Sequence, residues 1–230
     1  MAIICYLYDE KAFEKANKTL AGEADWPRRG CKFNNRAVVD TELLHNPEWL
    51  HFVVIREPIE RFLSGWMDKC YNLPAKNKGI QKIPTWCYGC KNNLSCFVQR
   101  NYESNLQFPQ RYKDKYKIIN LEDHFWPQNW FCNFTKYFDQ YTILKYSHDV
   151  DQGHEMFERL QQLLSQQNVE PSFIDKIIRQ ATERPKHATL GQKPTEHYRN
   201  LLLSDKNMMR TLVKTYYHDF VMFSFPFPEL

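Results

Sequence analysis

Residues 51–70 constrain the fold more than any other stretch, because they predict a buried strand leading through a short turn into an amphipathic helix. The strand part, Phe52 to Ile55, is short, apolar and rich in β-branched residues, as expected for a strand covered on both faces. Pro58 then stands where a helix accepts a fixed φ and a missing N–H. Apolar residues recur at helical spacing along the rest of the stretch. They are Ile59, Phe62, Leu63, Trp66 and Cys70.

The polar residues of this stretch are placed for binding an anion. A strand followed by a turn and a helix leaves Arg56 at the carboxyl end of the strand, where open α/β sheets bind their ligands. Ser64 follows about two turns into the helix. An arginine fork and a hydroxyl that converge there can clamp a phosphate. Alternatively, Arg56 pairs with Glu57 or Glu60 on the surface, and spacing alone does not decide between the two.

The residues themselves resemble a known motif. From Arg56 to Lys69 they read Arg-Glu-Pro-x-x-Arg-x-x-Ser-Gly followed by Asp-Lys. This resembles the 3′-phosphate-binding motif of the membrane-associated Golgi carbohydrate sulfotransferases, in particular the chondroitin 4-O- and HNK-1-type enzymes. The resemblance implies that Arg56 and Ser64 bind the 3′-phosphate of the sulfate donor, 3′-phosphoadenosine 5′-phosphosulfate, with Arg61 as a further candidate. It also implies an α/β fold, the three-layer P-loop-like sulfotransferase fold with a central, mainly parallel sheet.

Two later segments resemble the same family. One is dense in aromatic residues around His124, with Trp126 and Pro127-Gln128 close by. His124 is the candidate general base for the acceptor hydroxyl, and the alternative is that it only satisfies a hydrogen bond in a packed aromatic loop. The other segment is the C-terminal Tyr-x-x-Asp-Phe-x-x-Phe, residues 216–223, where we expect a helix to close and an aromatic strand to begin.

The remaining pattern predicts several more elements. Residues 2–20 read as one helix, and the other expected helices cover 97–108, 156–167 and 172–182, with strands over 116–121 and 141–146. The basic loop at residues 183–191 contains Lys186 and His187, which are further candidates for contacts with the nucleotide or an anionic glycan. The alternative is a solvated connection between helices.

The cysteines favour an oxidising compartment. There are seven in the chain, four of them between Cys70 and Cys96, and N-glycosylation sequons occur at Asn17, Asn93 and Asn133. Cys87 and Cys90 form a Cys-x-x-Cys pair, which can indicate zinc or redox chemistry, but no second pair at metal spacing follows. We therefore expect disulfides that staple a loop, without assigning the pairing.

Composition narrows the class of protein and the kind of partner. The chain has 230 residues, 43% hydrophobic residues and a formal net charge of +4. This suits one globular domain over residues 1–230 and an anionic ligand. No basic run is dense enough to favour nucleic acid, and no apolar run is long enough to cross a membrane, which takes about 20 residues. The resemblance implies a glycosaminoglycan-type acceptor and no metal.

The resemblance is incomplete at the N-terminus. The family holds the 5′-phosphosulfate with a loop between its first strand and first helix, and that loop would precede the helix expected over residues 2–20. We therefore expect an N-terminally truncated form of the fold that lacks sulfotransferase activity by itself. The full-length form would be a type II membrane protein of the Golgi lumen, attached through an anchor upstream of this chain. The alternatives are a catalytically inactive relative that binds glycan or nucleotide, and a disulfide-stapled secreted interaction protein.

Overall fold

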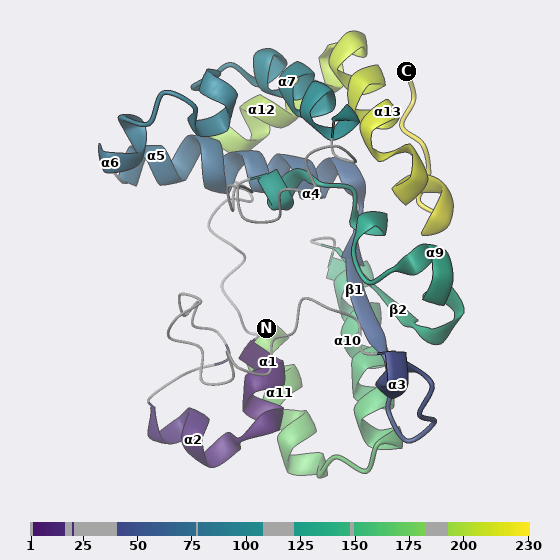
Figure 1. Ribbon diagram of the computed structural model, residues 1–230. Helices are drawn as coiled ribbons and strands as arrows, with labels where there is room; N and C mark the ends of the chain where they lie inside the picture. Colours follow the sequence, from purple (N-terminus) through teal and green to yellow (C-terminus); the bar gives the residue numbers. More distant parts are fainter. Residues whose placement is uncertain are drawn as a thin grey trace. The chain divides into compact units, whose positions relative to one another are not determined.

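The computed structural model describes residues 2–16, 20, 41–76, 78–107, 122–147, 150–182 and 193–230. The chain forms two compact units, each made of two segments of the sequence. Unit 1 comprises residues 1–55 and 136–185, and unit 2 comprises residues 56–135 and 186–230. Figure 1 labels their helices and strands.

Unit 1 contains a small parallel sheet. Its two strands are β1 (Phe52–Arg56) and β2 (Thr142–Tyr146). Both strands were predicted, because short β-branched runs fit a pleated, partly buried surface. Ile55 and Leu144 are buried, whereas the side chain of Val54 is 55% exposed. The expectation that β1 is covered on both faces is therefore wrong. The sheet, with its helices, agrees with the expected α/β sulfotransferase fold.

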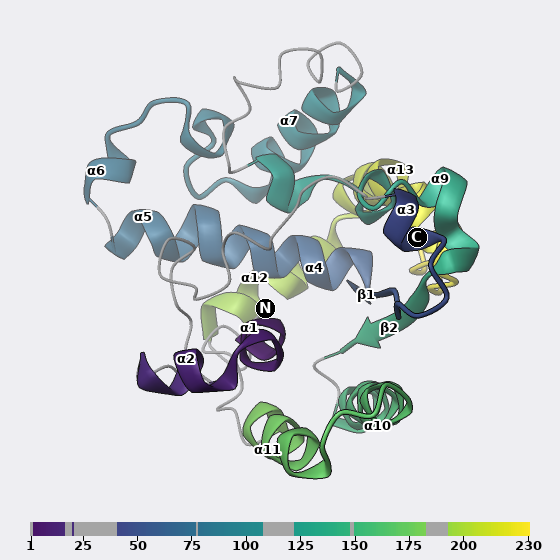
Figure 2. The ribbon, with the colours of Figure 1, turned by 60° about the horizontal axis from the view of Figure 1, so that its bottom comes forward.

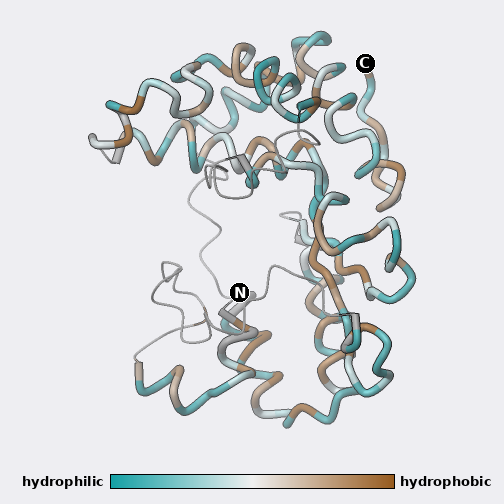
Figure 3. The backbone as a smooth tube through the Cα atoms, in the orientation of Figure 1, coloured by the Kyte–Doolittle hydropathy of each residue, from teal (hydrophilic) through white to brown (hydrophobic). Residues whose placement is uncertain are grey.

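Two amphipathic helices supply most of the core of unit 1. They are α10 (Val150–Gln166) and α11 (Pro171–Thr182), which pack against each other, and α10 also packs against β2. Figure 2 shows α10 and α11 side by side, and Figure 3 shows apolar and polar positions alternating along both. These helices confirm the predictions from helical spacing. Their buried positions include Leu160, Leu163, Ile174 and Ile177.

The N-terminal helical segment is broken, contrary to the prediction of one helix over residues 2–20. The structure has α1 (Ala2–Tyr8) and α2 (Glu10–Lys15) instead. Asp9 separates them, because it has extended backbone angles and its Oδ1 accepts a hydrogen bond from Ala12 N at 2.9 Å. Aspartate favours such caps because its side chain competes with the helical backbone for donors. A short helix, α3 (Thr41–Leu44), precedes β1.

Unit 2 is built on a long helical rod. The rod begins with α4 (Pro58–Gly65), continues as the π-helical turn η3 (Trp66–Asn72) and ends in α5 (Leu73–Lys76), as Figure 1 shows. The longer helices of this unit are α7 (Leu94–Leu106), α12 (Lys193–Ser204) and α13 (Lys206–Met222). Both α12 and α13 pack on α4. The core between them is aromatic, with Phe62, Trp66, Phe97 and Phe125 all fully buried.

Short elements complete the described chain. They are α6 (Lys78–Gln81), η4 (Trp86–Gly89), η5 (Glu122–Phe125), η6 (Gln128–Trp130), α9 (Phe134–Tyr137) and η7 (Phe138–Gln140). Among the described residues, no helix is both long enough and apolar enough to cross a membrane. The prediction of a single domain over residues 1–230 stays a prediction.

Two disulfides lie beside the rod. Cys70 in η3 is bonded to Cys87, and Cys90 is bonded to Cys96. The interpretation of this cluster as loop-stapling disulfides is therefore confirmed. Because Cys87 and Cys90 are bonded to different partners, the zinc and redox readings of the Cys-x-x-Cys pair are wrong.

The C-terminal segment differs from its prediction. Helix α13 extends to Met222 with a kink at Tyr216, where φ is −111° and ψ is 19°, and the residues after it form no strand. Leu212, Tyr216 and Phe220, which lie before, at and after the kink, are all buried. The aromatic content of the C-terminal segment led to the prediction of a strand, but these residues up to Met222 belong to α13. Helix α7 also begins earlier than predicted, because Asn93 caps it by accepting a hydrogen bond from Cys96 N at 2.9 Å.

Candidate functional site

Arg56 occupies the position that the sequence predicted, between a strand and a helix. It is the last residue of β1, and α4 begins two residues later at Pro58. Glu57 is the N-cap, and its carboxylate accepts a hydrogen bond from Glu60 N at 2.6 Å. Pro58 at the first helical position needs no partner for a backbone N–H. The local sequence therefore determines the direction of α4 and the backbone position from which the Arg56 side chain extends.

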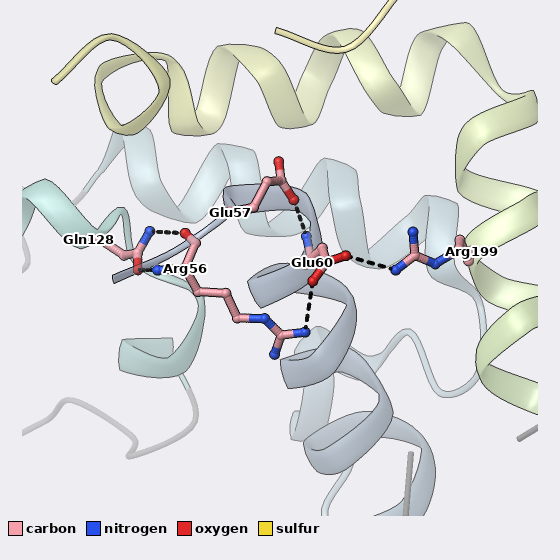
Figure 4. A network of polar contacts seen from close by, with 5 residues as sticks. All are labelled: Arg56, Glu57, Glu60, Gln128 and Arg199. Carbon is pink, nitrogen blue, oxygen red and sulfur yellow. Dashed lines mark hydrogen bonds and ion pairs between the residues drawn. The ribbon is translucent and has the colours of Figure 1, made fainter. Parts of the chain in front are cut away.

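Gln128 clamps the backbone of Arg56. Its side-chain oxygen accepts from Arg56 N at 2.9 Å, and its side-chain nitrogen donates to Arg56 O at 2.7 Å. Figure 4 shows both bonds. An amide side chain used in this way makes the same two hydrogen bonds as a neighbouring strand would. Both backbone polar groups of Arg56 are thus paired by Gln128, although Arg56 lies at the end of β1.

Gln128 is in turn positioned by α13. The fully buried Asp219 accepts hydrogen bonds from Gln128 N at 2.7 Å and from Asn129 N at 2.8 Å, at the start of η6. Burial raises the pKa of the Asp219 carboxyl, and the two N–H donors oppose this by favouring the ionised form. Tyr216, one turn earlier, donates its hydroxyl to Phe125 O at 2.8 Å. The C-terminal Tyr-x-x-Asp pattern therefore holds the aromatic segment in place.

The guanidinium of Arg56 belongs to a chain of three charges. Arg56 Nη2 lies 3.3 Å from Glu60 Oε2, and Arg199 Nη2 of α12 lies 3.1 Å from the other oxygen, Glu60 Oε1. Figure 4 shows Glu60 between the two arginines. Burial acts to raise the pKa of Glu60, but the hydrogen bond from Arg199 and the charge of Arg56 outweigh it, so the net pKa lies below its usual range. Glu60 is therefore ionised at neutral pH.

Ser64 lies one turn after Glu60 in α4. Glu60 and Ser64 are four residues apart and therefore lie on one face of that helix, whereas Arg56 precedes the helix as the last residue of β1. Ser64 is partly buried. Arg61 points elsewhere, because its Nη1 donates to Trp126 O at 2.7 Å. The convergence of Arg56 and Ser64 on one phosphate stays a prediction, and Arg61 contacts the aromatic segment.

His124 lies in η5 with acidic and basic side chains around it. Its Nδ1 is 3.3 Å from Asp123 Oδ1, and the His124 side chain is 44% exposed. Burial lowers the pKa of His124 and the charge of Lys69 lowers it further, while Asp123 and Asp68 oppose the shift. The imidazole is therefore mainly neutral at pH 7, the form that accepts a proton.

Several residues of this network were not singled out as site residues from the sequence. Gln128 and Asp219 stood in segments that carried the resemblance, but their role depends on contacts between distant parts of the chain. Arg199 carried no local signal at all. Lys186 and His187 lie outside the described residues. In the part of the chain that the structure describes, no cluster of three or more His, Cys, Asp or Glu is placed to hold a metal ion.

Comparison with known proteins gives one family and several relatives. Residues 1–226 match the model of the family described as "Sulfotransferase family". Three relatives from Caenorhabditis elegans are an uncharacterized protein (27% identical over 99% of this chain), putative sulfotransferase vep-2 (30% over 86%) and carbohydrate sulfotransferase chst-1 (28% over 97%). The chain spans 63%, 60% and 68% of their respective lengths. No solved structure matches the chain significantly.

Proposed function

This chain belongs to the sulfotransferase family, and we propose that it is a carbohydrate sulfotransferase whose donor is 3′-phosphoadenosine 5′-phosphosulfate. In this proposal Arg56 and Ser64 hold the 3′-phosphate of the donor. The acceptor is a hydroxyl of an anionic, glycosaminoglycan-type glycan. The name of the relative chst-1 supports a carbohydrate acceptor, and the net charge of +4 suits an anionic one.

One observation carries the donor site. The Arg56 guanidinium already contacts an anionic group, the Glu60 carboxylate, and Ser64 follows Glu60 by one turn on the same face of α4. Guanidinium groups bind phosphate oxygens with the same charge-assisted, often bidentate geometry that they use for carboxylates. The Arg56 side chain is only 15% exposed, so water screens its charge less than at an open surface. A 3′-phosphate at this place would receive the charge of Arg56 and the hydroxyl of Ser64.

The chemistry that follows is an in-line transfer. The acceptor hydroxyl oxygen forms a bond to sulfur, the bond from sulfur to the 5′-phosphate oxygen breaks, and 3′,5′-ADP leaves. The acceptor proton must go to a base. His124 fits this role because its lowered pKa keeps it neutral at pH 7 and its side chain is accessible. Trp126 and Trp130, with ring centroids 6.4 Å apart, lie in the segment that follows and offer apolar faces for a sugar ring.

The proposed location is the Golgi lumen. The two disulfides of unit 2 suit an oxidising secretory compartment. Asn93 and Asn133, both in sequons and both exposed, would be accessible for N-glycosylation there.

The donor site is tested by binding of 3′,5′-ADP to the purified chain in calorimetry. Arg56→Ala removes a charge-assisted contact worth ~2–4 kcal/mol and should lower the affinity by at least about 30-fold. Ser64→Ala removes one neutral hydrogen bond of ~1 kcal/mol and should cost about fivefold. Arg210→Ala, an exposed arginine of α13 in the same unit, is the matched control and should leave the affinity unchanged. Unchanged affinity in Arg56→Ala would remove the clamp from the proposal.

A further inference from the structure

The carboxylate of Glu60 is shared between two arginines from different elements. Its Oε2 faces Arg56 and its Oε1 faces Arg199, at 3.3 Å and 3.1 Å. The three side chains are 15%, 25% and 42% exposed for Arg56, Glu60 and Arg199. Exposure thus increases along the chain of charges, and Arg56, the proposed phosphate ligand, is the most shielded of the three.

A glutamate beside a phosphate ligand has two opposing effects. It orients the guanidinium, which is useful because a pre-positioned arginine loses less side-chain freedom on binding. The glutamate also weakens the attraction of the arginine for the anion. A ligand that approaches both side chains meets one negative and one positive charge, which largely cancel. The pair of Arg56 and Glu60 alone is neutral and would bind phosphate poorly.

Arg199 changes this balance. With its guanidinium on the second oxygen of Glu60, the group of three carries a net charge of +1. The neighbouring Glu57 carboxylate also interacts with Arg56 and Glu60, so without Arg199 the carboxylates here would outnumber the guanidinium groups. Glu60 can then hold Arg56 while its own charge is balanced from the other side. Arg199 comes from α12, which packs on α4, so the pairing is built into the packing of unit 2.

We propose that Arg199 is a positioning residue of the donor site, which balances the charge of Glu60 so that Arg56 is held in place and still attracts the donor's 3′-phosphate. The inference rests on the proposed function, since it assumes that Arg56 binds this phosphate. It assigns a role to a residue 139 positions away from Glu60 in the sequence. The competing role is structural, with Arg199 only tying α12 to α4.

The test is calorimetric binding of 3′,5′-ADP to wild type, Arg199→Gln, Arg199→Lys and the double variant Arg199→Gln/Glu60→Gln. Arg199→Gln leaves Glu60 unbalanced and should lower the affinity about tenfold. Arg199→Lys keeps the charge and should stay within about threefold of wild type. The double variant removes the unbalanced carboxylate as well and should recover most of the lost affinity. Arg210→Gln is the matched control for loss of an exposed arginine in unit 2.

The outcomes separate the inference from the proposed function. If wild type does not bind 3′,5′-ADP, the donor site itself is wrong. If wild type binds and Arg56→Ala does not, the donor site holds. In that case, affinity unchanged in Arg199→Gln, or a double variant that binds no better than Arg199→Gln, would overturn the role of Arg199. If Arg199 only connects α12 to α4, Arg199→Gln and the double variant should both have lower thermal stability, and the double variant should not recover affinity for 3′,5′-ADP.

Discussion

Arg56 is held by different residues at its backbone and at its guanidinium. Gln128 makes two hydrogen bonds to the backbone, and Glu60 contacts the charged end. The backbone contact depends on Asp219, because its carboxylate positions the N-terminus of η6. A side chain fixed at both ends is presented in one orientation, which reduces the entropy lost when it binds an anion. The position of this one residue thus links β1, η6, α4 and α13.

His124 is the second residue whose role can be tested directly. In a preparation that transfers labelled sulfate, His124→Gln should lower the transfer rate by about 100-fold or more, as for loss of a general base, and leave 3′,5′-ADP binding unchanged. His154→Gln, an exposed histidine of α10, is the control. Because the pKa of His124 is lowered, its base form persists to a lower pH than in an ordinary histidine, and the midpoint at which the wild-type rate falls with decreasing pH should lie below the usual pKa of histidine. Normal transfer by His124→Gln would favour the packed-loop reading.

At the scale of elements, the helical rod that contains Ser64 is cross-linked by a disulfide to the segment that follows it. Cys70 lies in η3, directly after α4, and its bond to Cys87 spans 17 residues, whereas the bond between Cys90 and Cys96 spans 6. Closing a longer loop restricts the unfolded chain more. Replacing both cysteines of the first bond by alanine should lower the free energy of unfolding by about 3 kcal/mol, against about 2 kcal/mol for the second bond.

Urea unfolding of the two double alanine variants, compared with wild type, measures this difference. The second variant serves as the matched control, since it also removes one disulfide from the same unit. An equal or larger loss from the shorter loop would contradict loop closure as the source of the stabilisation.

The elements that the sequence predicted well are those with a clear period. Helices α10 and α11 repeat apolar residues at helical spacing, and β1 and β2 are short β-branched runs. The misses have local physical causes. Asp9 caps a new helix inside an otherwise helical pattern, and the aromatic residues of the C-terminus lie on a helix face despite their preference for strands.

The placement of the candidate residues was predictable where it is local in the sequence. Arg56 was expected at the end of a strand and Ser64 in the helix that follows, and both lie there, while their role comes from the resemblance to a known motif and stays a prediction. Gln128 is 72 residues from Arg56, and Asp219 is 91 residues from Gln128, so their contacts depend on the packing of unit 2. The alternative that Arg56 pairs with Glu60 is confirmed, whereas the phosphate contact stays a prediction. In the proposal, Glu60 holds the arginine that binds the phosphate.

At the scale of the whole molecule, the match to the sulfotransferase family covers residues 1–226. The described residues form two units, one with a parallel two-stranded sheet and one mainly helical, and Arg56 is the last residue of β1. The chain spans about two thirds or less of each relative's length. Binding of the donor product is therefore the property on which the account depends most directly, since it can be measured on this chain without requiring that the chain transfers sulfate.

The most direct measurement compares the affinities of wild type and Arg56→Ala for 3′,5′-ADP and for 5′-AMP, which lacks the 3′-phosphate. Wild type should prefer 3′,5′-ADP by at least about 30-fold, equivalent to ~2 kcal/mol or more for charge-assisted contacts to one phosphate. Arg56→Ala should prefer 3′,5′-ADP by no more than about fivefold, the contribution assigned to the Ser64 hydroxyl. A wild-type chain that does not distinguish them, or an Arg56→Ala variant that keeps the full preference, would contradict a 3′-phosphate site at Arg56.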